Sequence, residues 1–414
     1  MRQSQLFTKT RREAPKDEVA KNAQLLIRGG FINKEMAGVY SFLPLGLRVL
    51  NNICAVIREE MNAIGGQEMQ MSALQNRELW EKTDRWSDEK VDAWFKTTLK
   101  GGGEVGLGLT HEEPLTAIMT EFIHSYRDLP VLAYQIQEKF RNETRAKSGI
   151  IRGREFLMKD LYSFARDEKE HARLYEKAKA AYLKIFERVG LGDKTFVTFA
   201  SGGVFSKYSE EFQTVSDAGE DTIYIDESKK IAVNKEVLSD EVLKEHGLNR
   251  AALVEQKAIE SGNIFNLGTR FSEPLGLFFT DEGGVKLPVV MGSYGLGPSR
   301  LMGTIAEVLS DEKGLVWPKA VAPFTIHLVE LSGGGEGVKT TADILYEKLN
   351  ARGVSVLYDD RDVSAGEKFA DAELIGIPYR VVVSAKTLEA DAVELTERLS
   401  GDTRMAKEEE LFSV

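Results

Sequence analysis

Residues 131–164 read VLAYQIQEKFRNETRAKSGIIRGREFLMKDLYSF, and this stretch decides the fold. Its first ten residues alternate between apolar and polar side chains, a pattern that is typical of a strand with one buried face and one polar face. We predict that the polar face is open to solvent and that a substrate could lie across the end of it. The polar positions are Gln135, Gln137, Lys139, Arg141 and Glu143.

A basic loop follows this strand and leads into a second strand, which opens with Glu155 and Phe156. Guanidinium groups bind phosphate in a bidentate manner, so the loop suits a polyphosphate or the end of a nucleic acid. The ring of Phe156 could stack on a base. The same residues also fit a surface hairpin with a solvated charged loop, because such loops are common. The basic residues of the loop are Arg145, Lys147, Arg152 and Arg154.

The composition is that of an ordinary globular protein. Its 414 residues allow two or three domains, and 42% of them are hydrophobic. The net charge of −11 gives no support to nucleic-acid binding, although a local basic surface can bind RNA on an acidic protein. The single cysteine, Cys54, excludes an intramolecular disulfide and a multi-cysteine zinc site. No run suits a membrane span and residues 1–18 lack the apolar core of a secretory signal, so we expect a cytoplasmic protein.

Two helices are predicted from apolar periodicity. Residues 47–64 carry apolar side chains at i, i+3 and i+4 spacing, and so do residues 168–189. Cys54 lies on the apolar stripe of the first helix and is interpreted as a core residue. A strand over residues 68–74 is expected directly after that helix.

A third helix is predicted to begin after Thr110, in the sequence THEEP. Two interpretations compete here. Thr110 and Glu113 have the T-x-x-E spacing of a capping box, and acidic residues are favourable at a helix N-terminus. The capping box leaves Glu112 free, so Glu112 is the stronger candidate for a ligand contact.

Residues 289–309 read as a strand, a glycine-containing turn and a helix that starts near Pro298. Gly295-x-Gly297 is only half of a dinucleotide-binding fingerprint, which makes it weak evidence for that fold. Arg300 falls in the first turn of the helix, where a cation is unfavourable unless an anion binds there. This arrangement indicates a phosphate site.

The region after residue 320 alternates between strands and helices, which predicts a small α/β domain with a mainly parallel sheet. We therefore expect domains over residues 1–320 and 321–414. Residues 238–258 are charge-rich and too few for a further domain, and we interpret them as a surface helix pair. Within the second domain, Asp360, Arg361 and Lys368 are typical of a solvated face but could also meet nucleotide bases.

These motifs together resemble a class II aminoacyl-tRNA synthetase of the bacterial-type prolyl family. FRNE, the basic loop and GREFLMKDLYSF (131–164) are similar to motif 2. Residues 47–75 resemble motif 1, residues 289–309 resemble motif 3 with its G-x-G-x-x-R, and the Thr110 turn resembles the T-x-E loop. Residues 321–414 resemble the anticodon-binding domain that the prolyl, threonyl, histidyl and glycyl enzymes share.

The resemblance implies an α+β fold, with an antiparallel catalytic sheet flanked by helices and a C-terminal α/β anticodon-binding domain. It implies an enzyme that activates L-proline with ATP and Mg²⁺ to prolyl-adenylate and transfers proline to tRNA(Pro). It also implies a cytoplasmic homodimer, with no zinc.

The resemblance assigns roles to individual residues. Arg141, Arg300 and Glu143 would be catalytic. The implied proline contacts are Thr110, Glu112, Arg141, Glu211 and Ser293. The implied ATP contacts are Arg141, Glu143, Arg152, Glu155, Phe156 and Arg300. The implied tRNA contacts are Arg145, Lys147, Asp360, Arg361 and Lys368.

Four positions depart from the family pattern. Ser72 replaces a usual Pro, Glu210 and Asn263 replace usual His residues, and Ser293 stands where many relatives have Cys. The editing domain that bacterial-type members often insert between motifs 2 and 3 is also missing. A separate editing protein, or tolerance, would then have to deal with mischarged alanine.

Two alternatives stay open. A sister class II enzyme such as the threonyl one shares the architecture, although the single cysteine argues against its zinc-dependent type. A synthetase-like tRNA-binding protein without activity would not need the phosphate arginines, Arg141 and Arg300, which are both present.

Overall fold

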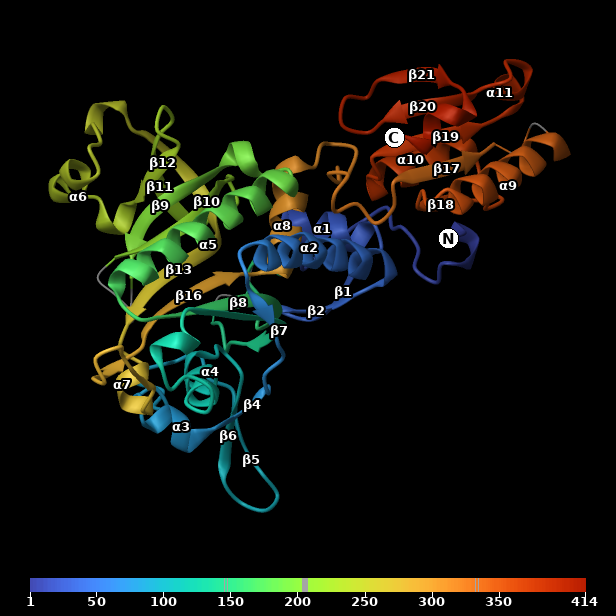
Figure 1. Ribbon diagram of the computed structural model, residues 1–414. Coiled ribbons are helices and arrows are strands. Elements are labelled where there is room, and N and C mark those ends of the chain that lie inside the picture. The colour runs from blue at the N-terminus through green and yellow to red at the C-terminus, as the bar shows by residue number, and fades with distance from the viewer. Residues whose placement is uncertain (145, 147, 203–207, 332, 334) are drawn as a thin grey trace. The chain divides into compact units, whose positions relative to one another are not determined.

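The computed structural model describes residues 1–414 except 145, 147, 203–207, 332 and 334 (Figure 1). The chain forms two compact units. The central unit comprises Met36–Val39 and Cys54–Thr304, and the C-terminal unit comprises Met1–Glu35, Tyr40–Ile53 and Ile305–Val414. The N-terminal residues therefore pack with the C-terminal residues. The expected division at residue 320 places these two segments in different domains. Within the described chain, none of the helices has the length and apolar character that crossing a bilayer requires.

The central unit is built on a nine-stranded sheet in the order β10-β9-β12-β11-β13-β16-β8-β7-β3. Neighbouring strands are antiparallel except in the pairs β12–β9 and β3–β7. The predicted antiparallel catalytic sheet is therefore confirmed. Its strands are β3 (Gln67–Glu68), β7 (Val131–Phe140), β8 (Glu155–Ala165), β9 (Thr195–Ser201), β10 (Tyr208–Val215), β11 (Asp221–Asp226), β12 (Ile231–Asn234), β13 (Val254–Gly268) and β16 (Val290–Leu296).

The predicted hairpin of residues 131–164 is present as β7 and β8, with Val131 opposite Phe164 and Phe140 opposite Glu155. The predicted solvent exposure of its polar face is wrong, because Gln135, Gln137 and Lys139 are buried. The backbone at Met71 covers the two glutamines. Its N–H donates to Gln135 Oε1 (3.0 Å), and its carbonyl accepts from Gln137 Nε2 (2.6 Å).

Helices cover the two faces of this sheet (Figure 1). Helix α5 (Glu168–Arg188) packs on β8, β13 and β16, and the Asp167 carboxylate caps it by accepting from Glu170 N–H (2.7 Å). Helix α4 (Glu112–Met119) lies on the other side, where Leu115 and Met119 join the core around Phe164. Because side chains alternate along β8, its residues face α5 and α4 in turn.

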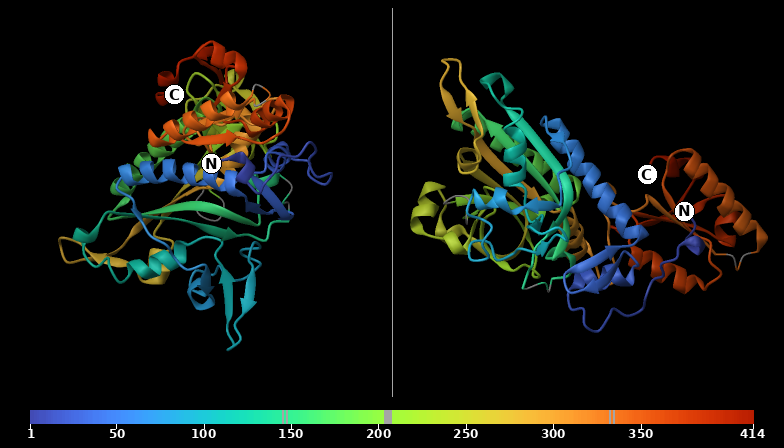
Figure 2. Two further views of the ribbon diagram at one scale, coloured as in Figure 1. Left: turned by 90° about the vertical axis from the view of Figure 1, so that its right-hand side faces the viewer. Right: turned by 90° about the horizontal axis from the view of Figure 1, so that it is seen from below.

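The remaining elements of the central unit are short. The strands β4, β5 and β6 form a small sheet whose β5–β6 end projects from the unit (Figure 2). The short elements of the central unit are β4 (Leu74–Asn76), β5 (Lys96–Thr98), β6 (Glu104–Leu107), β14 (Phe278–Thr280), β15 (Lys286–Pro288), α3 (Arg77–Glu81), α6 (Asp240–Glu245) and α7 (Ser272–Leu275). The chain further contains β1 (Ile32–Met36), β2 (Val39–Phe42), α2 (Pro44–Ala63) and α8 (Pro298–Leu309).

Two predicted elements differ from the structure. The strand expected over residues 68–74 is not continuous. Residue 68 ends β3, residue 74 begins β4, and the residues between them belong to neither strand. In place of the helix pair expected over residues 238–258, the structure has α6, one short 3-10 helix (Arg250–Ala252) and the start of β13. Gly247 has a φ of +63° and Leu248 N–H donates to Leu243 O (2.7 Å), a geometry that ends α6.

The C-terminal unit contains a five-stranded sheet in the order β18-β17-β19-β20-β21. The strand β17 is parallel to β18 and to β19, so the predicted alternation of strands and helices is confirmed. The sheet is not mainly parallel as predicted, because β20 is antiparallel to both β19 and β21. Its elements are α1 (Lys21–Arg28), β17 (Ile326–Glu330), α9 (Glu336–Ala351), β18 (Val356–Asp359), α10 (Ala365–Ile375), β19 (Tyr379–Val383), α11 (Ala385–Glu389), β20 (Val393–Glu397) and β21 (Thr403–Ala406).

Candidate active site

The turn that precedes α4 does not form the predicted capping box. His111 is the N-cap residue and its side chain does not cap the helix. Thr110 Oγ1 instead donates to both carboxylate oxygens of Glu112 (2.8 and 2.7 Å). Glu113 accepts from Arg85 Nη1 (2.9 Å) and from Thr83 Oγ1 (2.7 Å). Glu113 is therefore a structural residue, while Thr110 and Glu112 act as a pair.

The Glu112 carboxylate is buried among donors from three parts of the chain. Besides Thr110, Ser293 Oγ on β16 donates to it (3.1 Å) and Arg85 Nη1 lies 3.4 Å away. Only 2% of Glu112 is exposed. The structure thus brings together three of the predicted proline contacts, Thr110, Glu112 and Ser293.

A buried polar network supports this turn from below. Lys139 Nζ lies 2.9 Å from Asp160 Oδ1 and donates to His111 Nδ1 (2.7 Å). His111 therefore carries its proton on Nε2, which donates to the Ser72 carbonyl (3.0 Å). Burial, and then Lys139, lower the pKa of His111 to about 4, so the imidazole is neutral at physiological pH. The departure at Ser72 leaves this contact in place, because it uses the backbone.

Sequence reasoning missed this network and Arg85. The available signal was the placement of Lys139 and Asp160 on the polar side of neighbouring strands. Tyr162 connects the same groups, since its hydroxyl accepts from His111 N–H (3.0 Å) and donates to Asp160 Oδ2 (3.1 Å).

Arg141 lies at the end of β7 beside the turn. Its Nε and Nη2 donate to the Leu109 carbonyl (3.3 and 3.2 Å), and its Cζ lies 5.3 Å from the centre of the Phe156 ring. Burial and the nearby Arg300 both lower the pKa of Arg141. None of the ion pairs among the described residues includes it. Arg141 is half-buried, and a guanidinium that lacks a carboxylate partner and lies near another arginine is suited to an anion.

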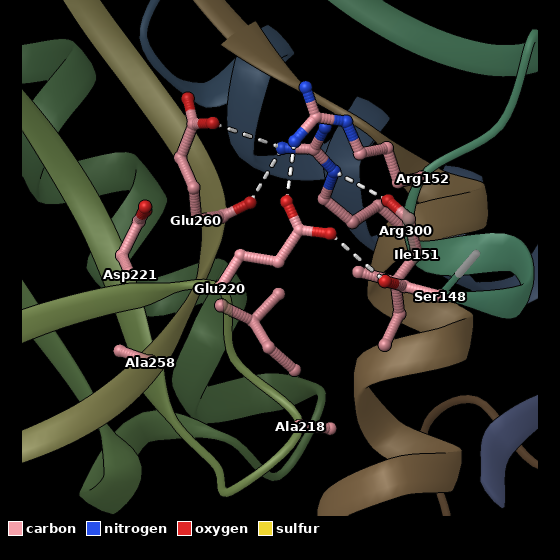
Figure 3. Close-up of a pocket in the computed structure, with 10 residues that line it drawn as sticks. Ser148, Ile151, Arg152, Ala218, Glu220, Asp221, Ala258, Glu260 and Arg300 are labelled. Carbon is pink, nitrogen blue, oxygen red and sulfur yellow. Dashed lines mark hydrogen bonds and ion pairs between the residues drawn. The ribbon is translucent and has the colours of Figure 1, made fainter. Parts of the chain in front are cut away.

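Arg300 lies in the first turn of α8 and points into a small cavity of about 70 Å³ (Figure 3). Its Nε donates to the Ile151 carbonyl (2.9 Å), and its Nη1 donates to the Glu260 carbonyl (2.6 Å) and lies 3.4 Å from Glu260 Oε2. Arg152 reaches the same cavity and joins Glu143 (3.0 Å) to Glu220 (2.5 Å). The structure therefore brings four of the predicted ATP contacts into one region, namely Arg141, Glu143, Arg152 and Arg300. A fifth predicted contact, Glu155, is exposed at the start of β8.

Three acidic side chains gather on the strands beside Arg300. Burial, and then the charge of Glu260, raise the pKa of Glu211 to about 8, and burial also raises the pKa of Asp221. Gln213 Nε2 donates to Glu211 Oε2 (2.8 Å) and to Asp221 Oδ2 (2.6 Å). Among the residues that the structure describes, no group of three His, Cys, Asp or Glu side chains has the geometry to hold a metal ion by itself.

The departures at Glu210 and Asn263 lie in different environments. Glu210 points to the α5 face of the sheet, where it pairs with Lys179 (3.1 Å), because side chains alternate along β10. Asn263 stays at the site, where its Nδ2 donates to Glu260 Oε1 (2.8 Å). A Cβ on Gly295 would lie 2.8 Å from Asn263 Oδ1, so glycine gives Asn263 room there.

The predicted tRNA contacts fall into two groups. Arg145 and Lys147 lie outside the described residues. In the C-terminal unit, Asp360 accepts from Ser4 N–H (3.0 Å) and Arg361 pairs with Asp359 (2.7 Å) and Asp371 (2.8 Å). Lys368 is 1% exposed and donates to two backbone carbonyls, those of Glu330 (2.8 Å) and Asp359 (3.2 Å). These three side chains are engaged within the protein.

Known proteins match this chain over nearly its whole length. The family model for the class II tRNA synthetase core domain (G, H, P, S and T) matches residues 95–309, and that for the anticodon binding domain matches residues 320–414. The proline–tRNA ligase of Methylobacterium sp. (strain 4-46) is 40% identical, covering 97% of this chain and 96% of the relative. This chain belongs to the proline–tRNA ligase family. A second relative, from Zymomonas mobilis subsp. mobilis (strain ATCC 10988), is 37% identical over 100% of this chain and 98% of its own.

Solved structures of prolyl-tRNA synthetases share the fold. The enzyme from Cryptosporidium parvum, complexed with halofuginone and AMPPNP, has a TM-score of 0.78 at 20% identity and covers 95% of this chain and 75% of its own. The enzyme from Giardia lamblia, in complex with prolyl-adenylate, has a TM-score of 0.78 at 18% identity, with 94% and 75% covered. The predicted class II architecture is therefore confirmed.

The raised pKa of Glu211 predicts a pH dependence of stability. The folded state holds this proton more tightly than the unfolded state, so its contribution to the free energy of unfolding is largest below about pH 4.5 and is lost as the pH rises through about 8. Glu211→Gln keeps a neutral side chain. We expect urea denaturation to show that the stability of this variant, relative to the parent, increases from pH 5 to pH 8.5.

The matched control is Glu210→Gln, which removes the neighbouring carboxylate on the opposite face. It should keep the pH dependence that Glu211 causes. Equal pH dependence in Glu211→Gln and the parent would show that Glu211 is not protonated in the folded protein at neutral pH.

Proposed function

We propose that this protein is a proline–tRNA ligase that activates L-proline with ATP and transfers it to tRNA(Pro). The observation that carries the proposal is the placement of a buried carboxylate, Glu112, and a half-buried guanidinium, Arg141, beside one turn. A zwitterionic amino acid has an ammonium group, which the Glu112 carboxylate complements, and a carboxylate, which the Arg141 guanidinium complements. Full-length similarity to proline–tRNA ligases supports the choice of proline.

In the first step, the secondary ammonium of proline donates to Glu112 and to Thr110, and its carboxylate approaches Arg141. A carboxylate oxygen then attacks the α-phosphate of ATP, which forms the mixed anhydride of prolyl-adenylate and expels pyrophosphate. Arg141 stabilises charge at the α-phosphate, and Arg300, with Arg152, binds the end of the triphosphate. The chemistry depends on positioning and charge stabilisation and needs no side-chain nucleophile.

Adenine stacks on Phe156, and Glu143 and Glu155 contact the nucleotide. Magnesium suits the acidic residues beside Arg300, because burial and the charge of Glu260 raise the pKa of Glu211 and of Asp221, and a divalent cation would offset both effects. Mg²⁺ is usually held by one or two carboxylates together with substrate phosphates, which fits a chain without a preformed metal cage among its described residues. Glu211 and Glu260 would hold it, where it would neutralise phosphate charge.

In the second step, a terminal ribose hydroxyl of tRNA(Pro) attacks the carbonyl of prolyl-adenylate, and AMP leaves. Arg145 and Lys147 in the motif 2 loop would contact the acceptor end. We propose that the enzyme acts in the cytoplasm as a homodimer, in which the motif 1 region 47–75 forms the interface.

Two alternatives give way to this reading. A threonyl enzyme is disfavoured by the proline–tRNA ligase relatives. An inactive tRNA-binding protein would have no use for a half-buried Arg141 that joins none of the ion pairs among the described residues. We expect the protein to catalyse ATP–pyrophosphate exchange with proline, weakly with alanine, and not with threonine or without an amino acid. Arg141→Ala should lower proline-dependent exchange about 10- to 100-fold, since it removes a charged hydrogen bond formed in the transition state. Absence of exchange with every amino acid would favour the inactive binding protein.

A second test concerns editing. Between β12 and β13 the chain has only short helical turns and α6, so this connection is too short to hold an inserted domain. Each methylene that a smaller substrate lacks weakens its binding by only about 1–3 kcal/mol, so the proline pocket discriminates weakly against alanine. Alanine should therefore be activated. We expect the purified protein to charge some tRNA(Pro) with alanine and to hydrolyse preformed alanyl-tRNA(Pro) no faster than buffer does. A separate editing protein would then clear the product, and hydrolysis well above the spontaneous rate would contradict this account.

A further inference from the structure

A groove of about 650 Å³ lies in the C-terminal unit, between the segment that follows the N-terminus and helix α10. One wall comes from residues 10–12 and from the last residue of α1, Arg28. The other comes from one side of α10, which begins after Ser364, and from Lys313. All of these residues belong to the same compact unit.

The groove presents arginines that are not neutralised by the protein. Arg11 and Arg12 are exposed and Arg28 is half-buried. None of the ion pairs among the described residues includes any of the three. Two of the three acids that line the groove are paired with other cations, because Asp371 pairs with Arg361 (2.8 Å) and Glu373 with Lys313 (3.3 Å) and Arg380 (3.5 Å). Lys313 also lines the groove, and the third acid, Glu367, joins none of the ion pairs among the described residues.

The backbone that carries these arginines is fixed in place. Arg11 N–H donates to the Arg28 carbonyl (2.8 Å), and Arg28 Nε donates back to the Arg11 carbonyl (3.4 Å). Thr10 Oγ1 donates to Asp371 Oδ1 on α10 (2.7 Å). The position of Arg28 in the last turn of α1 is favourable for helix stability by itself, but this explains neither Arg11 nor Arg12.

Three unpaired guanidinium groups on a preorganised backbone suit phosphate, which they bind in a bidentate manner. The chain as a whole has a net charge of −11, so a polyanion is repelled elsewhere and needs a local basic surface. The three predicted tRNA contacts nearby, Asp360, Arg361 and Lys368, are engaged within the protein.

We propose that this groove binds the phosphate backbone of the anticodon arm of tRNA(Pro). The proposal rests on the proposed function and adds to it the place where the arm is held. Helix α10 belongs to the residues that match the anticodon binding domain, which puts the anticodon arm, and not the acceptor end, beside the groove. Phosphate contacts position an RNA without reading its sequence, so the arginines contribute affinity and not base specificity.

The test compares two double variants of equal charge change. Arg11→Gln/Arg12→Gln removes two groove cations, and Lys319→Gln/Arg352→Gln removes two exposed cations of the same unit that do not line the groove. The dissociation constant for tRNA(Pro) is measured over a series of salt concentrations. Each lost phosphate contact should reduce the slope of log K against log salt by about 0.7–0.9, so the groove variant should lose about 1.4–1.8 and the control none.

Two further readouts separate the possible causes. ATP–pyrophosphate exchange with proline, run without tRNA, should be unchanged in both variants, which shows that the active site is intact. The isolated anticodon stem-loop of tRNA(Pro) should bind the groove variant more weakly than the parent, while an acceptor-stem minihelix should bind both equally. An unchanged salt slope, or an equal loss for the minihelix, would overturn the proposal. Absence of exchange in the parent protein would instead overturn the proposed function.

Discussion

The burial of the Glu112 carboxylate is the constraint on which the rest of the site depends. A buried carboxylate without donors costs several kcal/mol, so the fold must bring donors to it. Thr110 comes from the same turn, Ser293 from the motif 3 strand and Arg85 from the segment after α3. The carboxylate therefore fixes the distance between motif 3 and the T-x-E turn, and Arg141, bonded to the Leu109 carbonyl, fixes motif 2 to the same turn.

The alternation of side chains along the central strands sends neighbouring residues to opposite faces of the sheet. On β8, Lys159 points toward α5, where its ammonium contacts the Tyr182 hydroxyl and the Tyr294 carbonyl, whereas Asp160 points toward the turn and pairs with Lys139. On β10 the same alternation puts Glu210 against Lys179 and Glu211 at the site. A residue that departs from the family pattern can therefore leave the chemistry untouched, as we infer for Glu210, or lie within it, as Asn263 does.

The parts of this structure that sequence reasoning predicted are those that local periodicity determines. The β7–β8 hairpin, helix α5, the motif 3 helix and the alternating C-terminal unit all follow from spacing within one segment. The burial of Gln135 and Lys139 did not, because the cover comes from Met71 and His111, far away in the sequence. The internal bonds of Arg361 and Lys368, and the packing of the N-terminal segment with the C-terminal unit, depend on long-range contacts in the same way.

The most direct test of this account compares two neighbouring glutamates. Glu112→Gln and Glu113→Gln make the same change at adjacent buried positions, but only Glu112 is assigned to the substrate. In proline-dependent ATP–pyrophosphate exchange, the loss of a charged hydrogen bond, worth about 1.5–3 kcal/mol, should raise the KM for proline about 10- to 100-fold in Glu112→Gln, with the KM for ATP unchanged. Glu113→Gln should lower the thermal stability and leave the KM for proline near that of the parent. Equal KM values for proline in both variants and the parent would contradict the assignment of Glu112 as the residue that binds the ammonium of proline.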